Sequence, residues 1–323
     1  MITPPQADAP TAAPTGPARR RRGRWAWALA LGVVAVVAVL VVVLTNGGTP
    51  GSSGNPAESG SAVGPVHPPG DVVKPVGGPS GVAWKVQFDE NFGGDTASVL
   101  DSGVWHAGWF GNGKVTGPVN SQETSLFSVD NLSVSGGVAR FDVTPNSDHL
   151  ALGDGTTQPN LGAALNTDES QASRGFAITY GYVEARMQMP AGDRTEGVWP
   201  AFWLNGQTWP DDMEIDVVEG DGTDQGNKFN IHHGSNDHDT TNLNDVGRRR
   251  TVPGATTGMH TYAADIRPDG ITYFYDGAPV YSYQGKVPNS PRYLMVGASS
   301  EGTMTSTKSL LVDYVRAWTR AGS

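Results

Sequence analysis

The stretch Asp211–Gly220 reads D-D-M-E-I-D-V-V-E-G and sets Glu214, Asp216 and Glu219 among β-branched apolar residues. Acidic residues that alternate with Ile and Val predict a β-strand with one carboxylate face and one core face. Side chains two residues apart share a face, so the acid after Asp216 would be expected at position 218. One extra residue, a β-bulge around Val217–Val218, would return Glu219 to the face of Glu214. The stretch therefore predicts three carboxylates that project into one groove.

Three carboxylates on one strand face are compatible with several kinds of site. Like charges at close range raise each other's pKa, which suits a pair with one ionised and one protonated member. Two carboxyl groups about 5–5.5 Å apart form the apparatus of retaining glycosidases. Clustered carboxylates also bind Ca²⁺, and a merely solvated strand face has no chemical role. The acids alone leave these interpretations open.

Aromatic residues and a histidine flank the acids. Trp199 and Trp203 lie just upstream in G-V-W-P-A-F-W-L-N, followed by Trp209. Pyranose C–H faces pack on aromatic rings, so Trp199 and Trp203 are candidate sugar-binding residues, although Trp is also mostly buried in protein cores. Downstream, F-N-I-H-H-G predicts a strand on which only one of two adjacent histidines faces the groove. The chain has neither H-x-H nor H-E-x-x-H, which disfavours a zinc site.

The region from about residue 82 onward predicts an all-β domain. Its 43 Gly and 23 Pro, counted over the whole chain, favour turns over long helices. The motifs R-P-D-G and D-G-A-P predict hairpins around Ile266–Ile271 and Tyr275–Val280. Many short strands indicate a β-sandwich or jelly roll. The runs are 83–88, 132–134, 138–143, 180–189, 213–218, 229–233, 260–266, 271–275, 293–298 and 310–318.

Charge and cysteine content exclude several classes of protein. The net charge is −10, and an acidic chain is a poor nucleic-acid binder because phosphate contacts need a basic surface. The chain has no cysteine, which rules out disulfides, thiolate zinc sites and a cysteine nucleophile. Stability then depends on a large core, with or without a bound ion.

The N-terminal quarter of the chain predicts a membrane anchor. Residues 1–24 form a disordered segment with an arginine cluster, and residues 25–44 are an apolar run of the length that spans a bilayer. The arginines predict a cytoplasmic N-terminus, so the rest would be extracellular at the cell membrane. A cleaved signal peptide, which would give a secreted protein, is the competing interpretation. Residues 45–80 are a Gly/Ser/Pro-rich linker, and 81–319 form the folded domain.

The acidic strand and its flanks resemble glycoside hydrolase family 16. E-I-D-V-V-E at Glu214–Glu219 resembles the family signature E-[ILV]-D-x-x-E, in the bulged form typical of laminarinase-type and agarase-type members rather than lichenases. The resemblance covers about residues 82–319. The other matching segments, in the family's order, are Phe88–Phe92, Tyr180–Arg186, Trp199–Trp203, Tyr275–Gly277 and Val312–Arg316.

The resemblance implies a β-jelly roll of two curved antiparallel sheets and a retaining double displacement on a polysaccharide. Glu214 would be the nucleophile, Asp216 its assisting residue and Glu219 the acid/base. It also implies that no cofactor is needed for catalysis, and we expect a monomer. The residues it assigns to substrate are Trp199, Trp203, His232, Asn120 and Glu123, the last two in the first cleft loop. The residues it assigns to a structural calcium ion are Glu90 and Asp313.

Three functions fit this pattern. The first is endo-acting hydrolysis of a β-linked polysaccharide, for which β-1,3-glucan is the expected substrate. The second is transglycosylation, in which another sugar replaces water as the acceptor. The third is a non-catalytic carbohydrate-binding protein, which the presence of all three acids disfavours because a binding protein could dispense with them.

Overall fold

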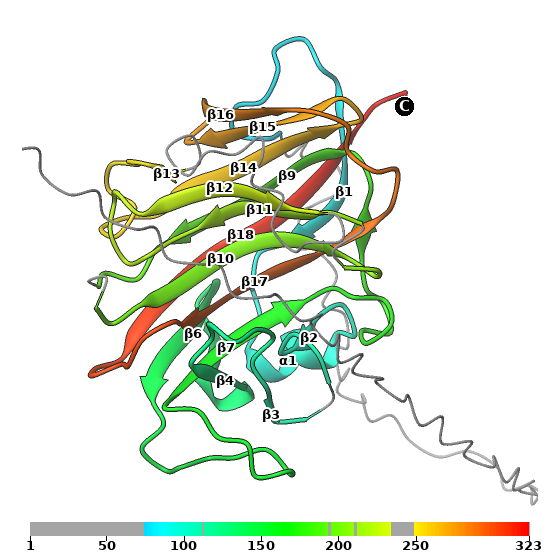
Figure 1. Cartoon of the computed structure of the whole chain (residues 1–323). Coiled ribbons are helices and arrows are strands. Elements are labelled where there is room, and N and C mark those ends of the chain that lie inside the picture. Colours follow the sequence, from blue (N-terminus) through cyan, green and yellow to red (C-terminus); the bar gives the residue numbers. More distant parts are fainter. Residues whose placement is uncertain (1–73, 112, 193–194, 210–211, 234–248, 323) are drawn as a thin grey trace, which may run out of the picture. The chain divides into compact units, whose positions relative to one another are not determined.

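The computed structural model describes residues 74–322 except 112, 193–194, 210–211 and 234–248 (Figure 1). The predicted membrane helix at 25–44, the segment before it and most of the 45–80 linker lie outside the described residues. Within the described part of the chain, no helix is long and apolar enough to cross a bilayer.

The described residues form an all-β domain, as predicted, with one short α-helix. Asp95 caps that helix by accepting a hydrogen bond from the backbone N–H of Ser98 at 2.8 Å. The elements are β1 (Trp84–Glu90), α1 (Thr96–Asp101), β2 (His106–Ala107), β3 (Val115–Thr116), β4 (Ser125–Ser128), a 3₁₀ turn (Val129–Asn131), β5 (Leu132–Ser135), β6 (Val138–Pro145), β7 (Asn160–Asn166), β8 (Ala177–Ile178), β9 (Gly181–Gln188), β10 (Val198–Gly206), β11 (Glu214–Glu219), β12 (Asn227–His232), β13 (Arg249–Arg250), β14 (His260–Arg267), β15 (Gly270–Tyr275), β16 (Ala278–Gln284), β17 (Arg292–Ser300) and β18 (Lys308–Arg320).

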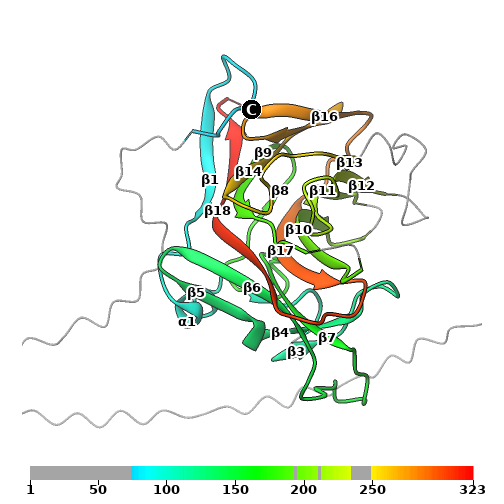
Figure 2. The same ribbon diagram turned by 90° about the vertical axis from the view of Figure 1, so that its left-hand side faces the viewer.

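Two large sheets, A and B, form the sandwich, and Figure 2 shows these layers from the side. A smaller set of pairings joins β3 to β4, β4 to β7 and the end of β6 to β7. Sheet A runs β16-β15-β14-β9-β18, and β1 and β6 pair with successive parts of the other edge of β18. Sheet B runs β13-β12-β11-β10-β17-β7-β2. The pairings are antiparallel as predicted, except that β4 runs parallel to β7 at one end of the sandwich. This arrangement matches the predicted sandwich.

The core lies between the sheets because each strand turns its apolar face inward. Phe202 and Phe229 of sheet B and Phe141 and Met187 of sheet A are fully buried in one continuous cluster. Full burial of such a side chain contributes about 1.5–3 kcal/mol, so this cluster fixes how the sheets face each other. The opposite surface of sheet B is thereby left free to form a cleft.

Each of the ten predicted runs falls on a strand, but no run covers the short strands β2, β3, β4, β8 and β13, nor β16, nor the central strands β7 and β10. Every residue of β7 is buried, so its sequence N-L-G-A-A-L-N shows no polar face. β10 carries Pro200, which normally argues against a central strand because it has no N–H to donate. Here Pro200 lies next to the bulge of β11, and its carbonyl accepts a hydrogen bond from Gly220 N at 2.9 Å.

The folded contacts begin before the predicted domain boundary at residue 81. The backbone N–H of Val76 donates to Oε2 of Glu184 at 2.9 Å, and the hydroxyl of Tyr182 donates to the carbonyl of Val76 at 3.1 Å. Gly77 lies so close to Gly277 that a Cβ would come within 2.3 Å of its Cα. The end of the Gly/Pro-rich segment is therefore a strap on sheet A rather than free linker.

Candidate active site

The predicted bulge is present in β11. Against β10, Phe202 pairs with Val218 and Trp203 pairs with Asp216, which leaves Val217 as the extra residue. Against β12, the register also shifts between Asp216 and Glu219. A bulge re-aims the residues that follow it, and Glu219 accordingly lines the same cleft as the other two acids. The structure thus confirms the arrangement inferred from the spacing E-x-D-x-x-E.

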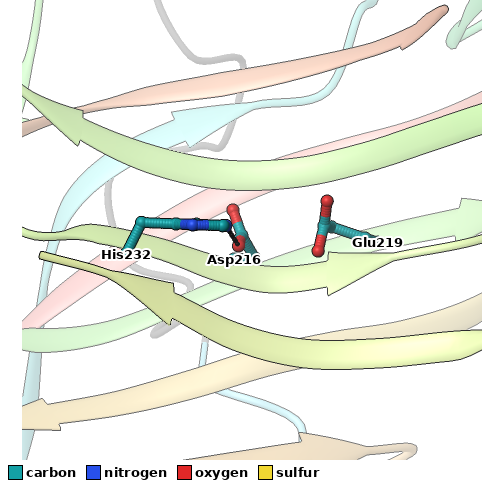
Figure 3. A group of neighbouring side chains, drawn as sticks. All are labelled: Asp216, Glu219 and His232. Carbon is teal, nitrogen blue, oxygen red and sulfur yellow. Dashed lines mark ion pairs between the residues drawn. The ribbon is translucent and has the colours of Figure 1, made fainter. Parts of the chain in front are cut away.

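Each acid of the cluster has its own neighbour. The indole Nε1 of Trp209 donates to Oε2 of Glu214 at 2.5 Å, and that of Trp199 donates to Oε1 of Glu219 at 2.9 Å. Nε2 of His232 lies 3.2 Å from Oδ2 of Asp216, and Figure 3 shows the imidazole directed at that carboxylate. All three acids are buried, with 2–7% of their surface exposed. The three carboxylates are therefore held separately rather than sharing one partner.

Burial dominates the ionisation of this cluster. Burial, and then the charge of Asp216, raises the pKa of Glu214 to about 8, against the opposing effects of His232 and Trp209. The pKa of Glu219 is raised by burial and then by Asp216, against Lys228, His232 and Trp199. Burial therefore raises the pKa values of both glutamates, and the two titrate as a coupled pair.

The effect of burial on the pKa of His232 is opposite to its effect on the acids, and the charges of the acids outweigh it. Burial alone would lower the pKa of His232, but the bond to Asp216 and the charges of the three acids raise it to about 10. An imidazolium cation thus accompanies Asp216 at neutral pH. His232 and Asp216 therefore form a buried pair beside the two glutamates.

The acids lie in a cleft of about 420 Å³. It crosses the strands of sheet B, from Lys228, Asn230 and His232 on β12, over β11 and β10, to β17 and the loop between β3 and β4. Trp199 and Trp203 both line it. Trp199 is half-buried, whereas Trp203 is 5% exposed and also packs in a small aromatic core. The structure therefore brings both predicted tryptophans to the cleft.

The loop between β3 and β4 also reaches the cleft. Asn120 and Glu123 both line it, and Oδ1 of Asn120 accepts the backbone N–H of Glu123 at 3.1 Å. Glu123 accepts the N–H of Val119 at 2.7 Å and the hydroxyl of Ser299 at 3.1 Å. Burial raises the pKa of Glu123 to about 7, against these two bonds.

Two groups of residues bear on metal binding. Asp216, Glu219 and His232 each offer one ligand atom, and these atoms lie within 4.8 Å of one another (Figure 3). Carboxylate and imidazole ligands suit a borderline cation such as Zn²⁺. Such an ion would occupy the atoms that a proton-transfer site needs, so we treat this group as acid–base machinery.

The residues predicted to hold calcium lie away from the cleft on sheet A. Glu90 accepts the backbone N–H of Phe92 at 2.7 Å and the indole N–H of Trp105 at 3.0 Å. Asp313 pairs with the guanidinium of Arg186 at 2.5 Å. Both carboxylates thus have protein donors, and a cation beside Arg186 would meet like charge. Calcium binding here would require Asp313 to release Arg186, and the calcium site stays a prediction.

Four of the cleft residues that the predicted site lacked bear directly on the acids and their neighbours. Trp209 stood out in the sequence only as a flanking aromatic residue, although it contacts Glu214. Lys228 faces the cleft opposite Glu219 in the β11–β12 register, and a single lysine on a strand carries no signal by itself. Trp109 and Ser299 reach the cleft from distant segments. Only long-range pairing brings such residues together.

Comparison with known proteins matches residues 138–316, more than half of the chain, to the model of glycosyl hydrolases family 16. The chain belongs to this family. The family 16 chain is 28% identical over 254 residues to the endo-1,3-1,4-β-glycanase EglC of Rhizobium meliloti, covering 72% of this chain and 51% of the relative. It is 27% identical to ExsH, an endo-1,3-1,4-β-glycanase of the same organism, covering 69% of this chain and 48% of the relative. It spans about half the length of these curated relatives.

Solved structures share the fold of the family 16 chain. The endo-β-1,3-glucanase from Pyrococcus furiosus superimposes with a TM-score of 0.60 at 19% identity, covering 76% of this chain and 97% of the other. The laminarinase from Rhodothermus marinus gives a TM-score of 0.57 at 22% identity, covering 74% and 99%. These matches agree with the predicted jelly roll.

Proposed function

We propose that the chain is an endo-acting, retaining glycosidase that cleaves a β-linked polysaccharide, with β-1,3-glucan as the substrate we favour. The observation that carries the proposal is the bulge in β11, which places Glu214, Asp216 and Glu219 in one cleft lined by tryptophans. The curated relatives are named as β-glycanases that act on 1,3- and 1,4-linkages, which supports this substrate class.

In the first step, a carboxylate oxygen of Glu214 attacks the anomeric carbon and the glycosidic C–O bond breaks. The proton of Glu219 goes to the leaving oxygen. Burial supports this role because it raises the pKa of Glu219 and favours the acid form. The hydrogen bond from Trp209 supports the ionised form of Glu214, which the attack requires.

In the second step, water attacks the same anomeric carbon, Glu219 takes the proton of that water, and Glu214 leaves as the carboxylate. The pairing with His232 holds the side chain of Asp216 in place through the step. If a sugar hydroxyl takes the place of water, the same sequence gives transglycosylation. The two activities therefore share every residue and differ in the acceptor.

The experiment incubates the full-length chain with laminarin, lichenan, agarose, carrageenan and xyloglucan and measures reducing ends. We expect release from laminarin, with the new anomeric centre appearing first in the β-configuration by NMR. An α-configured first product would refute retention. Longer products after addition of an oligosaccharide acceptor would establish transglycosylation, and binding without any release would favour a carbohydrate-binding protein.

We also propose that the chain is anchored in a membrane and that it binds a structural calcium ion. Residues 25–44 have the length and composition of a membrane span, which supports a single-pass chain with the catalytic domain outside the cell. Retention of the chain in membranes after alkaline extraction tests the anchor. Thermal unfolding with added calcium and with a chelator tests the ion, and equal midpoints would contradict a structural calcium site.

A further inference from the structure

The turn between β2 and β3 presents an aromatic side chain to solvent. Phe110 is 51% exposed, more than any other large apolar side chain in the described part of the chain. A single exposed apolar side chain is common on protein surfaces, so what matters for Phe110 is where its ring lies. Phe110 belongs to none of the catalytic or binding roles assigned above.

The turn that carries Phe110 is held rigidly. Gly108 and Gly111 have φ of 89° and 93°, a region that favours glycine, and they bracket Trp109 and Phe110. The side-chain amide of Asn166, which is fully buried, donates to the carbonyl of Gly108 at 2.8 Å. The ring nitrogen Nε2 of His106 lies 2.9 Å from the carbonyl of Gly111. The exposure of Phe110 is therefore built into the fold.

Phe110 continues a row of aromatic rings that starts beside the acids. Trp203 pairs with Asp216 across β10 and β11, and its ring meets that of Trp109 edge-on at 5.2 Å. The ring of Trp109 in turn stacks on that of Phe110, with centroids 5.8 Å apart and planes 25° apart. Trp203 and Trp109 line the cleft, and Phe110 lies beyond its lining. The row follows the direction in which the cleft crosses sheet B toward β2.

We propose that Phe110 is an outer sugar-binding platform, which contacts a β-glucan chain where that chain leaves the cleft past Trp109. The platform rests on the proposed function, since it takes the same polymer. A polymer cut internally extends beyond the central cleft, and a neutral pyranose packs its C–H face on an exposed ring. The rigid turn means that little conformational entropy is lost on binding.

The experiment compares the full-length wild type with Phe110→Ala, Phe110→Trp and Val86→Ala. Val86 is a matched control because it is 37% exposed on β1 in sheet A, away from the cleft. KM and kcat are measured on laminarin and on short β-1,3-glucan oligosaccharides. Laminarin binding is also measured in a Glu214→Gln background, and the oligomeric state by sedimentation.

We expect Phe110→Ala to raise KM for laminarin about two- to tenfold, the range that an aromatic contact of about 0.5–1.5 kcal/mol gives. Laminarin affinity should fall by the same factor, kcat and the short oligosaccharides should be unaffected, and Phe110→Trp should retain affinity. Unchanged affinity in Phe110→Ala would overturn the platform alone. A change in oligomeric state instead would assign Phe110 to a contact between copies. If the wild type neither binds nor cleaves laminarin, the proposed substrate and the platform both fail.

Discussion

The indole Nε1 of Trp209 donates a hydrogen bond to Oε2 of Glu214 at 2.5 Å, although the two residues are only five positions apart and Trp209 itself is 41% exposed. Trp199 makes the equivalent bond to Glu219 at 2.9 Å from a different strand. Two carboxyl groups that both favour protonation are thus each matched to one indole donor. This symmetry lets the roles of the two acids be separated by experiment.

We predict that Trp209→Phe lowers kcat about tenfold to a hundredfold. The substitution removes a hydrogen bond to a charged group, worth about 1.5–3 kcal/mol, and keeps the aromatic ring. The bond lowers the pKa of Glu214, so its loss raises that pKa and moves the acid limb of the pH–rate profile to higher pH. Measurement of kcat across a pH series checks this prediction. An acid limb that does not move would contradict the assignment of Glu214 as the nucleophile.

We predict that Trp199→Phe, the matched variant, moves the other limb. The bond from Trp199 lowers the pKa of Glu219, so its loss raises that pKa and extends activity to higher pH on the basic side. The same pH series measures the position of the basic limb. A shift of the acid limb in this variant would exchange the roles of Glu214 and Glu219.

We predict that Glu219→Gln is defective mainly on substrates with poor leaving groups. General acid catalysis contributes about 10²–10⁴-fold to rate, and an aryl leaving group needs no proton for departure. In Glu219→Gln, the first step, in which Glu214 is glycosylated, should therefore survive with an activated aryl β-glucoside. Glu214→Gln should lose activity on both kinds of substrate. Equal losses on both substrates in Glu219→Gln would argue against the acid/base role.

We predict that Lys228→Met raises the pH at which activity declines. The charge of Lys228 lowers the pKa of Glu219, while Asp216 raises it and His232 and Trp199 lower it. Without the lysine, Glu219 keeps its proton to higher pH, and the basic limb should move upward with little change in KM. Lys85→Met is the control, because Lys85 is an exposed residue of β1. A basic limb identical to that of the wild type would show that Lys228 does not act on Glu219.

We predict that Glu184→Gln makes the domain less sensitive to pH. Burial raises the pKa of Glu184 from 4.5 to about 7, against the bonds from Tyr314 and Val76 and the charge of Arg316. The folded state then holds a proton that the unfolded state has lost, so the stabilisation present below pH 4.5 is lost as pH rises through about 7. The amide of Gln can accept from Val76 and donate to Tyr314, so the contacts survive.

Chemical unfolding between pH 4 and 8 measures this effect on stability. The free energy of unfolding of Glu184→Gln should decline less steeply over this range than that of the wild type, by about 1–3 kcal/mol in total. Glu123, which is also buried, leaves part of the decline in place. The exposed Glu169→Gln should follow the wild type, and a Glu184→Gln curve parallel to it would disprove the assignment.

Local sequence was sufficient to predict the strand that carries the acids, the bulge in that strand and the all-β class of the domain. Side-chain alternation depends only on neighbouring residues, so E-I-D-V-V-E specifies which side chains share a face wherever the strand lies. The paired histidines of I-H-H-G likewise showed that only one could face the cleft, and His232 does so. The resemblance to family 16 rests on segments of the same local kind.

Only the tertiary structure decided which groups surround the acids. Ser299 binds Glu123 from 176 residues away, Lys228 faces Glu219 through the register of two strands, and Trp109 reaches the cleft from the turn beyond β2. Burial in this assembled cleft, rather than the identity of the glutamates, raises their pKa values. The sequence by itself thus determined the chemistry of the strand, because that depends on neighbouring residues. The environment that tunes it depends on long-range packing and desolvation, which no local pattern encodes.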